Sequence, residues 1–166
     1  MPVKKFSQKP VWLSTFFVLF GLTLSLILPY HLTAQEEINP LLTEFKTPFG
    51  TPPFDLIKNE HFLPAIKKGI EAQQAEIEAI VNNPKPPTFE NTILAFDRTG
   101  KLLSRVMAVF GTLQGANTSP ELQKIAMEAT PLTTQHRSSI YLNDRLFARI
   151  KSVYERKDQL KLGQEE

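Results

Sequence analysis

The sequence predicts an all-α protein with about four amphipathic helices. Apolar residues recur at helical spacing from about residue 60 onward, turn-forming residues separate the helical stretches, and no stretch alternates like a β-strand. The predicted helices cover residues 60–82, 89–116, 120–142 and 144–160. The chain has 166 residues, of which 42% are hydrophobic, so it is long enough for one ordinary domain and too apolar to be disordered.

The first helix is predicted from a stripe of apolar residues. They are spaced four, four, seven and three positions apart, which places them on one helical face: Phe62, Ile66, Ile70, Ile77 and Ile80. Pro64 lies in the first turn, where its missing N–H leaves no helical hydrogen bond unmade. The helix is expected to end at Asn82 and the proline-rich segment 84–87.

The other three helices begin at residues typical of N-caps. Thr88, Ser119 and Asn143 are predicted to accept hydrogen bonds from the first turn of each helix. Pro131 lies inside the third helix, so we expect a kink or break near Thr130. The predicted buried residues are Ile93, Phe96, Leu103, Val106, Phe110 and Leu113 in the second helix, Leu122, Ile125, Ala129, Leu132 and Ile140 in the third, and Leu146, Phe147, Ile150, Val153 and Tyr154 in the fourth.

Residues 35–58 are predicted to form an extended lead-in before the helical region 59–166. Several prolines and Gly50 interrupt any helical period there. The lead-in nevertheless carries apolar side chains, which we expect to lie on the helices: Phe45, Phe49, Phe54, Leu56 and Ile57.

Residues 1–34 have the pattern of a secretory signal peptide. Lysines precede the uncharged apolar stretch 11–28, and Ala34 and Gln35 flank the predicted cleavage site. An uncleaved membrane anchor is the alternative, because a helix of this length spans about 27 Å, close to the hydrocarbon thickness of a bilayer. In both cases the rest of the chain is predicted to be exported, to the periplasm or beyond, and to meet a membrane only if the segment is retained.

Composition limits the chemistry of the chain. There is no cysteine, which excludes disulfides, a thiolate nucleophile and cysteine-based metal sites. The formal charge of +2 comes from lysines before the apolar stretch, and no basic patch remains to bind nucleic acid. No histidine stands in an H-E-x-x-H motif, so we predict no catalytic residue and no metal ligand. We expect a capping or surface role for His61 and a hydrogen-bonded packing role for His136.

A series of short motifs in a fixed order makes the sequence more specific. It includes FDLI at 54–57, EHFLPAI at 60–66, PTFENTI at 87–93, TG at 99–100, RV at 105–106, ANT at 116–118 and IYLN at 140–143. The residues singled out in it are Phe54, Asp55, His61, Pro64, Thr88, Phe89, Asn91, Thr92, Arg105, Phe110, Asn117 and Asn143. Taken together, the motifs resemble the opening of the thimet-oligopeptidase family of zinc peptidases, and most of all its bacterial peptidyl-dipeptidase branch.

The resemblance implies an almost wholly helical, two-lobed enzyme with a deep channel, which removes dipeptides from the C-termini of short peptides. It also implies that Zn2+ is held by the two histidines of H-E-x-x-H and a further glutamate, in a C-terminal catalytic region. This sequence lacks that motif. We therefore expect a truncated or partial gene product that binds no cofactor alone, walls the channel, and has the catalytic region and short peptides as partners.

Two other hypotheses remain open. The chain could be a stand-alone periplasmic helical module for binding or adaptor functions, because its helices are well capped and self-contained. It could also hydrolyse peptides unaided, although the required spacing of metal ligands is missing.

Overall fold

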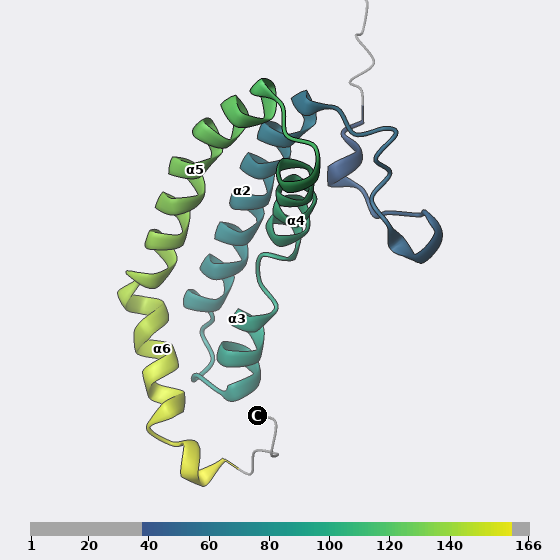
Figure 1. The fold of residues 1–166 in the computed structure, drawn as a ribbon. Coiled ribbons are helices and arrows are strands. Elements are labelled where there is room, and N and C mark those ends of the chain that lie inside the picture. Colours follow the sequence, from purple (N-terminus) through teal and green to yellow (C-terminus); the bar gives the residue numbers. More distant parts are fainter. Residues whose placement is uncertain (1–37, 161–166) are drawn as a thin grey trace, which may run out of the picture. The chain divides into compact units, whose positions relative to one another are not determined.

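Helices and helical turns are the only regular elements of the computed structural model, which describes residues 38–160. The long helices are α2 (Phe62–Val81), α4 (Lys101–Ala116), α5 (Pro120–Tyr141) and α6 (Asp144–Tyr154) (Figure 1). The described residues contain no strand, which confirms the predicted all-α class. The predicted signal segment, with Ala34 and Gln35, lies outside the described residues.

Short turns connect these helices. Three 3-10 turns, Pro40–Leu42, Pro48–Gly50 and Asn59–His61, precede α2, and another, Lys157–Gln159, follows α6. Between α2 and α4 lie a π-helical turn, Phe89–Leu94, and the single-turn helix α3 (Ala95–Asp97). The lead-in is therefore less extended than predicted, since two of the turns fall within it.

All three predicted N-caps are confirmed. The Thr88 hydroxyl accepts from the Asn91 N–H at 3.2 Å, and the Asn91 side chain accepts in return from the Thr88 N–H at 2.8 Å. Ser119 accepts from the Leu122 N–H at 3.2 Å at the start of α5, and Asn143 accepts from the Leu146 N–H at 3.0 Å at the start of α6. These side chains satisfy N–H groups that would otherwise have no partner in the first turn of a helix.

The predicted second helix, 89–116, is interrupted, and the prediction of one continuous helix is wrong. Gly100 adopts a left-handed conformation, with φ of 75°, between α3 and α4. Its N–H donates to the Glu76 carboxylate of α2 at 2.7 Å, and Thr99 donates its hydroxyl to the Phe96 carbonyl at 2.9 Å. The break between α3 and α4 is thus stabilised in part by a side chain of α2.

The helices α5 and α6 also differ from the predictions, α5 at its proline and α6 at its end. The helix α5 runs without interruption through Pro131, so the break expected near Thr130 is absent. Pro131 is exposed, and the hydroxyls of Thr130 and Thr133 donate to the carbonyls of Ala126 at 2.7 Å and Ala129 at 3.1 Å. The helix α6 ends at Tyr154, not at residue 160.

The core consists of two buried clusters joined by α2. The larger cluster packs α2 against α4, α5 and the lead-in, and the rings of Phe62 and Phe110 meet in it with centroids 5.0 Å apart. The smaller one joins the C-terminal end of α2 to Leu146 of α6. Most of the predicted stripes are buried or partly buried, but Phe147 is 63% exposed and Tyr154 64% exposed, so both were wrongly assigned to the core.

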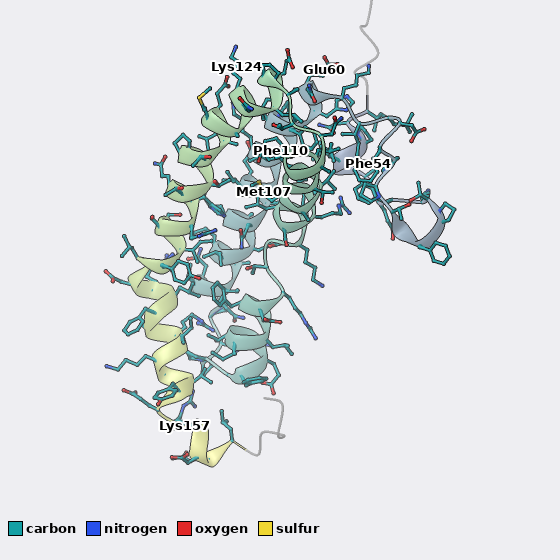
Figure 2. The ribbon with its side chains drawn as sticks, in the orientation of Figure 1. Phe54, Glu60, Met107, Phe110, Lys124 and Lys157 are labelled. Atoms are coloured by element: carbon teal, nitrogen blue, oxygen red, sulfur yellow. The ribbon has the colours of Figure 1, made fainter. Side chains whose placement is uncertain are left out.

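The lead-in contacts the helices at fewer points than predicted. Phe45 and Ile57 pack against the larger cluster, whereas Phe49, Phe54 and Leu56 are exposed. Figure 2 shows Phe54 in the lead-in. The deepest contact is made by Leu41, which is fully buried and was not predicted. 

Arginine side chains hold the irregular segments onto the helices. Arg105 of α4 donates to the Leu41 carbonyl at 3.1 Å and lies over the Phe45 ring. Three arginines in and just after α6 donate to backbone carbonyls between the last residue of α2 and the π-helical turn: Arg145 to Val81, Arg149 to Asn83, and Arg156 to Pro87. The proline-rich segment cannot pair its own carbonyls in regular structure, so these guanidinium groups supply the donors.

The helices α2 and α4 approach most closely at Gly69. A Cβ atom built on Gly69 would lie 2.8 Å from the Leu103 Cα atom, which is shorter than a van der Waals contact. Replacing Gly69 with alanine should therefore push α4 away from α2. Overpacking of this kind costs about 1–3 kcal/mol, so the midpoint of urea unfolding should fall.

Gly111→Ala is the matched control for this substitution. It lies in α4, where an added Cβ would meet nothing within 4 Å. Alanine favours the helix over glycine by up to about 1 kcal/mol, so this variant should be at least as stable as the unmodified chain. An unchanged unfolding midpoint for Gly69→Ala would contradict the close contact.

Candidate functional site

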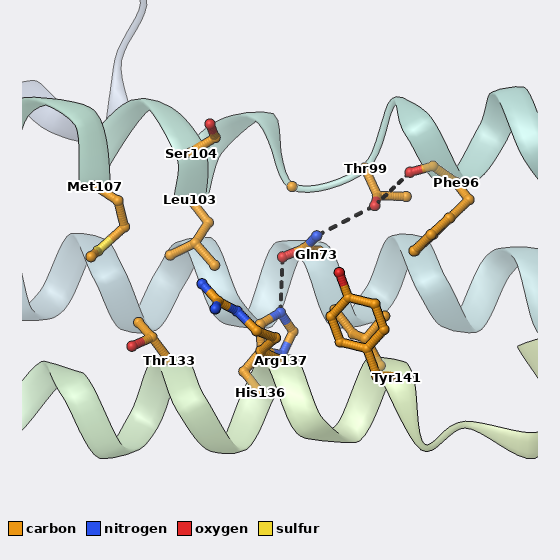
Figure 3. A pocket seen from close by; sticks show the side chains of 12 residues that line it. Gln73, Phe96, Thr99, Leu103, Ser104, Met107, Thr133, His136, Arg137 and Tyr141 are labelled. Atoms are coloured by element: carbon orange, nitrogen blue, oxygen red, sulfur yellow. Dashed lines mark hydrogen bonds between the residues drawn. The ribbon is translucent and has the colours of Figure 1, made fainter.

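A pocket of about 440 Å³ lies between α2, the α3–α4 junction and α5 (Figure 3). One part of its lining is apolar and comes from Phe96, Leu103, Met107 and Ile140. The rest is polar and includes Gln73 from α2 and His136 from α5. The pocket exists because the chain leaves the helical path at Gly100, opposite α5.

A chain of hydrogen bonds crosses the floor of this pocket. The Phe96 carbonyl can only accept, so the Thr99 hydroxyl donates to it at 2.9 Å. The Thr99 oxygen then accepts from the Gln73 amide nitrogen at 3.4 Å, and the Gln73 amide oxygen faces His136 Nε2 at 2.9 Å. This order requires His136 to carry a proton on Nε2. Figure 3 shows Gln73 as the link between α5 and the α3–α4 junction.

His136 is a packing residue, as predicted. Its side chain is only 7% exposed, and burial lowers its pKa below the ordinary value of 6.5. A neutral imidazole with Nε2 protonated can donate to Gln73 and leaves Nδ1 as an acceptor. His61 is also buried, and its Nδ1 accepts from the Lys58 N–H at 3.0 Å, which is the predicted capping role.

The described part of the chain offers no arrangement for metal binding. No three His, Asp or Glu side chains come together there in a group that could hold an ion. Within the same residues, no helix has the length and apolar character needed to cross a membrane.

The predicted motif residues do not form one site. Phe54 and Asp55 are exposed in the lead-in, Pro64 is in the first turn of α2, and Asn117 follows α4. Arg105 holds the lead-in, and Phe110 is in the larger core cluster. His61 and Asn143 act at helix starts, whereas Thr88, Phe89, Asn91 and Thr92 lie together in and beside the π-helical turn.

Asn91 connects the motif residues of the π-helical turn with α6. Its amide nitrogen donates to the Pro86 carbonyl at 2.9 Å, and its oxygen accepts from the fully buried Thr92 hydroxyl at 2.8 Å. Arg149 donates to the same oxygen at 3.3 Å. These contacts stabilise a loop, and none of them presents a reactive group.

The pocket was not predicted from the sequence. Gln73, Arg137 and Tyr141 belong to none of the motifs singled out in the sequence, although Gln73 lies between Ile70 and Ile77 at the edge of the apolar stripe of α2. A polar residue at such an edge gives a weak signal, because many surface residues occupy the same position.

The chain is similar in sequence to several known bacterial enzymes. No family model matches the chain. Dipeptidyl carboxypeptidase of Escherichia coli (strain K12) is 41% identical over 131 residues, which are 79% of this chain and 19% of that protein. The Salmonella typhimurium (strain LT2) enzyme of the same name is 42% identical over 127 residues, or 76% of this chain and 19% of that protein. Oligopeptidase A of the same Salmonella strain is 29% identical over 109 residues, which are 66% of this chain and 15% of that protein.

The fold and these similarities show that the chain is a helical segment homologous to part of several bacterial peptidases. The chain belongs to the thimet-oligopeptidase family, which confirms the resemblance found in the motifs. It spans about a fifth of the length of the dipeptidyl carboxypeptidases that it matches, at 19%.

The stability of the chain should fall as the pH falls below neutrality, in a way that depends on His136. In the folded chain the pKa of His136 is lowered, so the unfolded chain takes up a proton first and gains stability relative to the folded one below about pH 6.5. Other charged side chains lining the two pockets that meet at His136 are Lys67 and Glu71 of α2 and Arg137 of α5.

Urea unfolding of the chain and of His136→Gln between pH 7.5 and pH 5 tests this expectation. The free energy of unfolding should decrease less steeply with acidification in the variant. Parallel curves would show that His136 does not contribute to the pH dependence.

Proposed function

We propose that this chain is a non-catalytic helical portion of an exported zinc dipeptidyl carboxypeptidase and that it forms part of the wall of the substrate channel. The observation that carries the proposal is the 41% identity with the Escherichia coli enzyme over 131 residues. Identity at that level over a continuous, well-packed helical unit favours an equivalent structural role. In the complete enzyme, the substrates would be short peptides that lose a C-terminal dipeptide.

The exposed side chains support a role next to other protein. Tyr141, Leu142 and Phe147 are 77%, 80% and 63% exposed, and they follow one another along the end of α5 and the start of α6. Large apolar side chains grouped on a surface are typical of regions that contact further polypeptide or a ligand. The remaining length of a dipeptidyl carboxypeptidase would supply that polypeptide.

Zinc chemistry belongs, in this proposal, to the catalytic region. The described residues do not fit a zinc site, because no three of their His, Asp or Glu side chains come together in a group that could hold the ion. Zinc in such enzymes activates a water molecule for attack on the peptide bond. The residues of this chain would shape the channel and exclude folded proteins from it.

A chimera tests the channel-wall role. The 131 aligned residues of the Escherichia coli enzyme are replaced by the matching residues of this chain, and release of dipeptides is measured. We expect activity within about tenfold of the parent enzyme, because equivalent helices would restore the wall. Replacement by an unrelated helical bundle of the same length is the control and should abolish activity. A folded but inactive chimera would contradict the proposal.

The purified 166-residue chain should neither release dipeptides nor retain stoichiometric zinc after dialysis, because metal-site chemistry requires at least three protein ligands. Elemental analysis and a peptidase assay with added zinc provide the measurements. Zinc-dependent release of dipeptides by this chain alone would favour the hypothesis of unaided hydrolysis.

Export can be tested with the first 40 residues fused to an alkaline phosphatase that is active only outside the cytoplasm. We expect activity from the fusion, and a loss of activity when charged residues interrupt the apolar stretch 11–28, because a targeting segment needs an apolar core. The N-terminal sequence of the exported product should start at Gln35 if the segment is cleaved. Activity of the fusion that does not depend on the apolar stretch would contradict export through it.

One observation favours the alternative of a stand-alone helical module: the described residues contain two buried clusters of their own. Thermal unfolding of the purified chain separates the two proposals. A sharp, cooperative transition of a monomer favours the module, whereas aggregation or a broad transition favours a segment that lacks its packing partner. We expect a broad transition, because exposed apolar side chains such as Leu142 and Phe147 lack a packing partner within the described residues.

A further inference from the structure

We infer that the pocket between α2, α4 and α5 binds a small amphipathic carboxylate, which is an apolar group ending in one negatively charged carboxyl group. The inference does not rest on the proposed peptidase function, because it follows from the shape and chemistry of the pocket alone. The carboxylate could be the free C-terminus of a short peptide or a small apolar acid, and both share the same chemistry.

The size and the apolar lining of the pocket suit such a ligand. Its volume of about 440 Å³ falls within the range of small-molecule sites in proteins. Phe96, Leu103, Met107 and Ile140 line the pocket with aromatic and aliphatic groups that can contact the apolar part of the ligand. This surface comes from three separate elements, so a ligand there would contact α3, α4 and α5 together.

The charge of the pocket favours an anion. Arg137 is the one charged residue that lines it, and its exposed guanidinium forms no ion pair or hydrogen bond within the described residues. The nearby Glu76 carboxylate already accepts from the Gly100 N–H at 2.7 Å. A guanidinium presents parallel N–H donors that match the two oxygens of a carboxylate.

The other polar groups at the pocket add donors. The hydroxyls of Ser104 and Tyr141 line it and make no hydrogen bond within the described residues. Figure 3 shows Arg137 extending from α5 toward α4, the helix that carries Ser104. One cation with two hydroxyls beside an apolar wall fits a monoanionic carboxylate better than a phosphate, which carries more charge.

The floor of the pocket is formed before a ligand arrives. Gln73 is held by Thr99 and His136, and it lies against Gly100 so closely that a Cβ atom there would approach its amide nitrogen to 2.4 Å. A floor that is already ordered reduces the entropy lost on binding.

Two other pockets of the described residues lack this combination. In the pocket between the lead-in and α4, the cation is Arg105, which already donates to the Leu41 carbonyl and lies over the Phe45 ring. The pocket on the other side of His136 is lined by both Lys67 and Glu71, so its charges offset each other. Of these three pockets, the one with Arg137 alone combines an apolar wall with an uncompensated cation.

Binding can be measured by isothermal titration of the purified full chain with two pairs of probes. The first pair is 4-phenylbutyrate and its amide, and the second is N-acetyl-alanyl-phenylalanine and its C-terminal amide. We expect each acid to bind at least about tenfold more tightly than its amide, because only the acid carries the charge that Arg137 recognises. Tighter binding of the peptide acid would identify a peptide C-terminus as the ligand, and equal binding would identify small apolar acids in general.

Substitutions locate the site. Arg137→Gln should weaken binding of both acids about tenfold and leave the amides unchanged. Ser104→Trp, which places a large ring at the pocket, should reduce binding of acids and amides alike. Lys124→Gln is the matched control: it removes one positive charge from α5, thirteen residues or about 20 Å along the helix from Arg137, and should change nothing (Figure 2).

Three results would overturn the inference. Equal affinity for acids and amides would exclude recognition of the carboxylate. Unchanged affinity of the acids for Arg137→Gln would place the ligand elsewhere, and an equal loss in Lys124→Gln would reduce the effect to general electrostatic attraction. Circular dichroism of each variant controls for folding, and Ser104→Trp tests the pocket independently if Arg137→Gln is unfolded.

Discussion

The close contact between Gly69 of α2 and Leu103 of α4 determines how the other helices can be arranged. Because glycine has no Cβ atom, the backbone of α4 lies directly against α2, and a side chain at Gly69 would force the two helices apart. The helix α2 also packs against α5 and α6, so it lies at the centre of the described residues. Both buried clusters draw residues from it, and a shift of α2 would disturb both.

Gln73 lies one helical turn after Gly69 and forms hydrogen bonds across this helix contact. Its amide reaches His136 on one side and Thr99 on the other, so it connects α5 with the α3–α4 junction. Buried polar groups are stable only when their donors and acceptors are paired. The pocket lies beside these hydrogen bonds, where Gly100 interrupts the helical path between α3 and α4.

The irregular segments depend on charge-assisted hydrogen bonds. Arg105 binds the lead-in, and Arg145, Arg149 and Arg156 bind carbonyls at the end of α2 and along the segment that leads to the π-helical turn. Prolines cannot donate from the backbone, and the segments that contain them form no ladder or helix, so side-chain donors from the helices must satisfy their carbonyls. The motif residue Arg105 therefore has a structural role, which is to hold the lead-in against α4.

The helical class, the capping residues and most of the core could be read from the sequence, because they depend on residues a few positions apart. The periods of Phe62, Ile66 and Ile77 and the caps at Thr88, Ser119 and Asn143 are local patterns. Family membership was equally visible in the order of the motifs. The interruption at Gly100 was not, since a glycine within an apolar period is compatible with a continuous helix until Glu76 and Gln73 reach it from α2. The exposure of Phe147 and the pocket beside Arg137 likewise arise only when separate helices meet, because the number of neighbours that cover a helix face is a property of the packed chain.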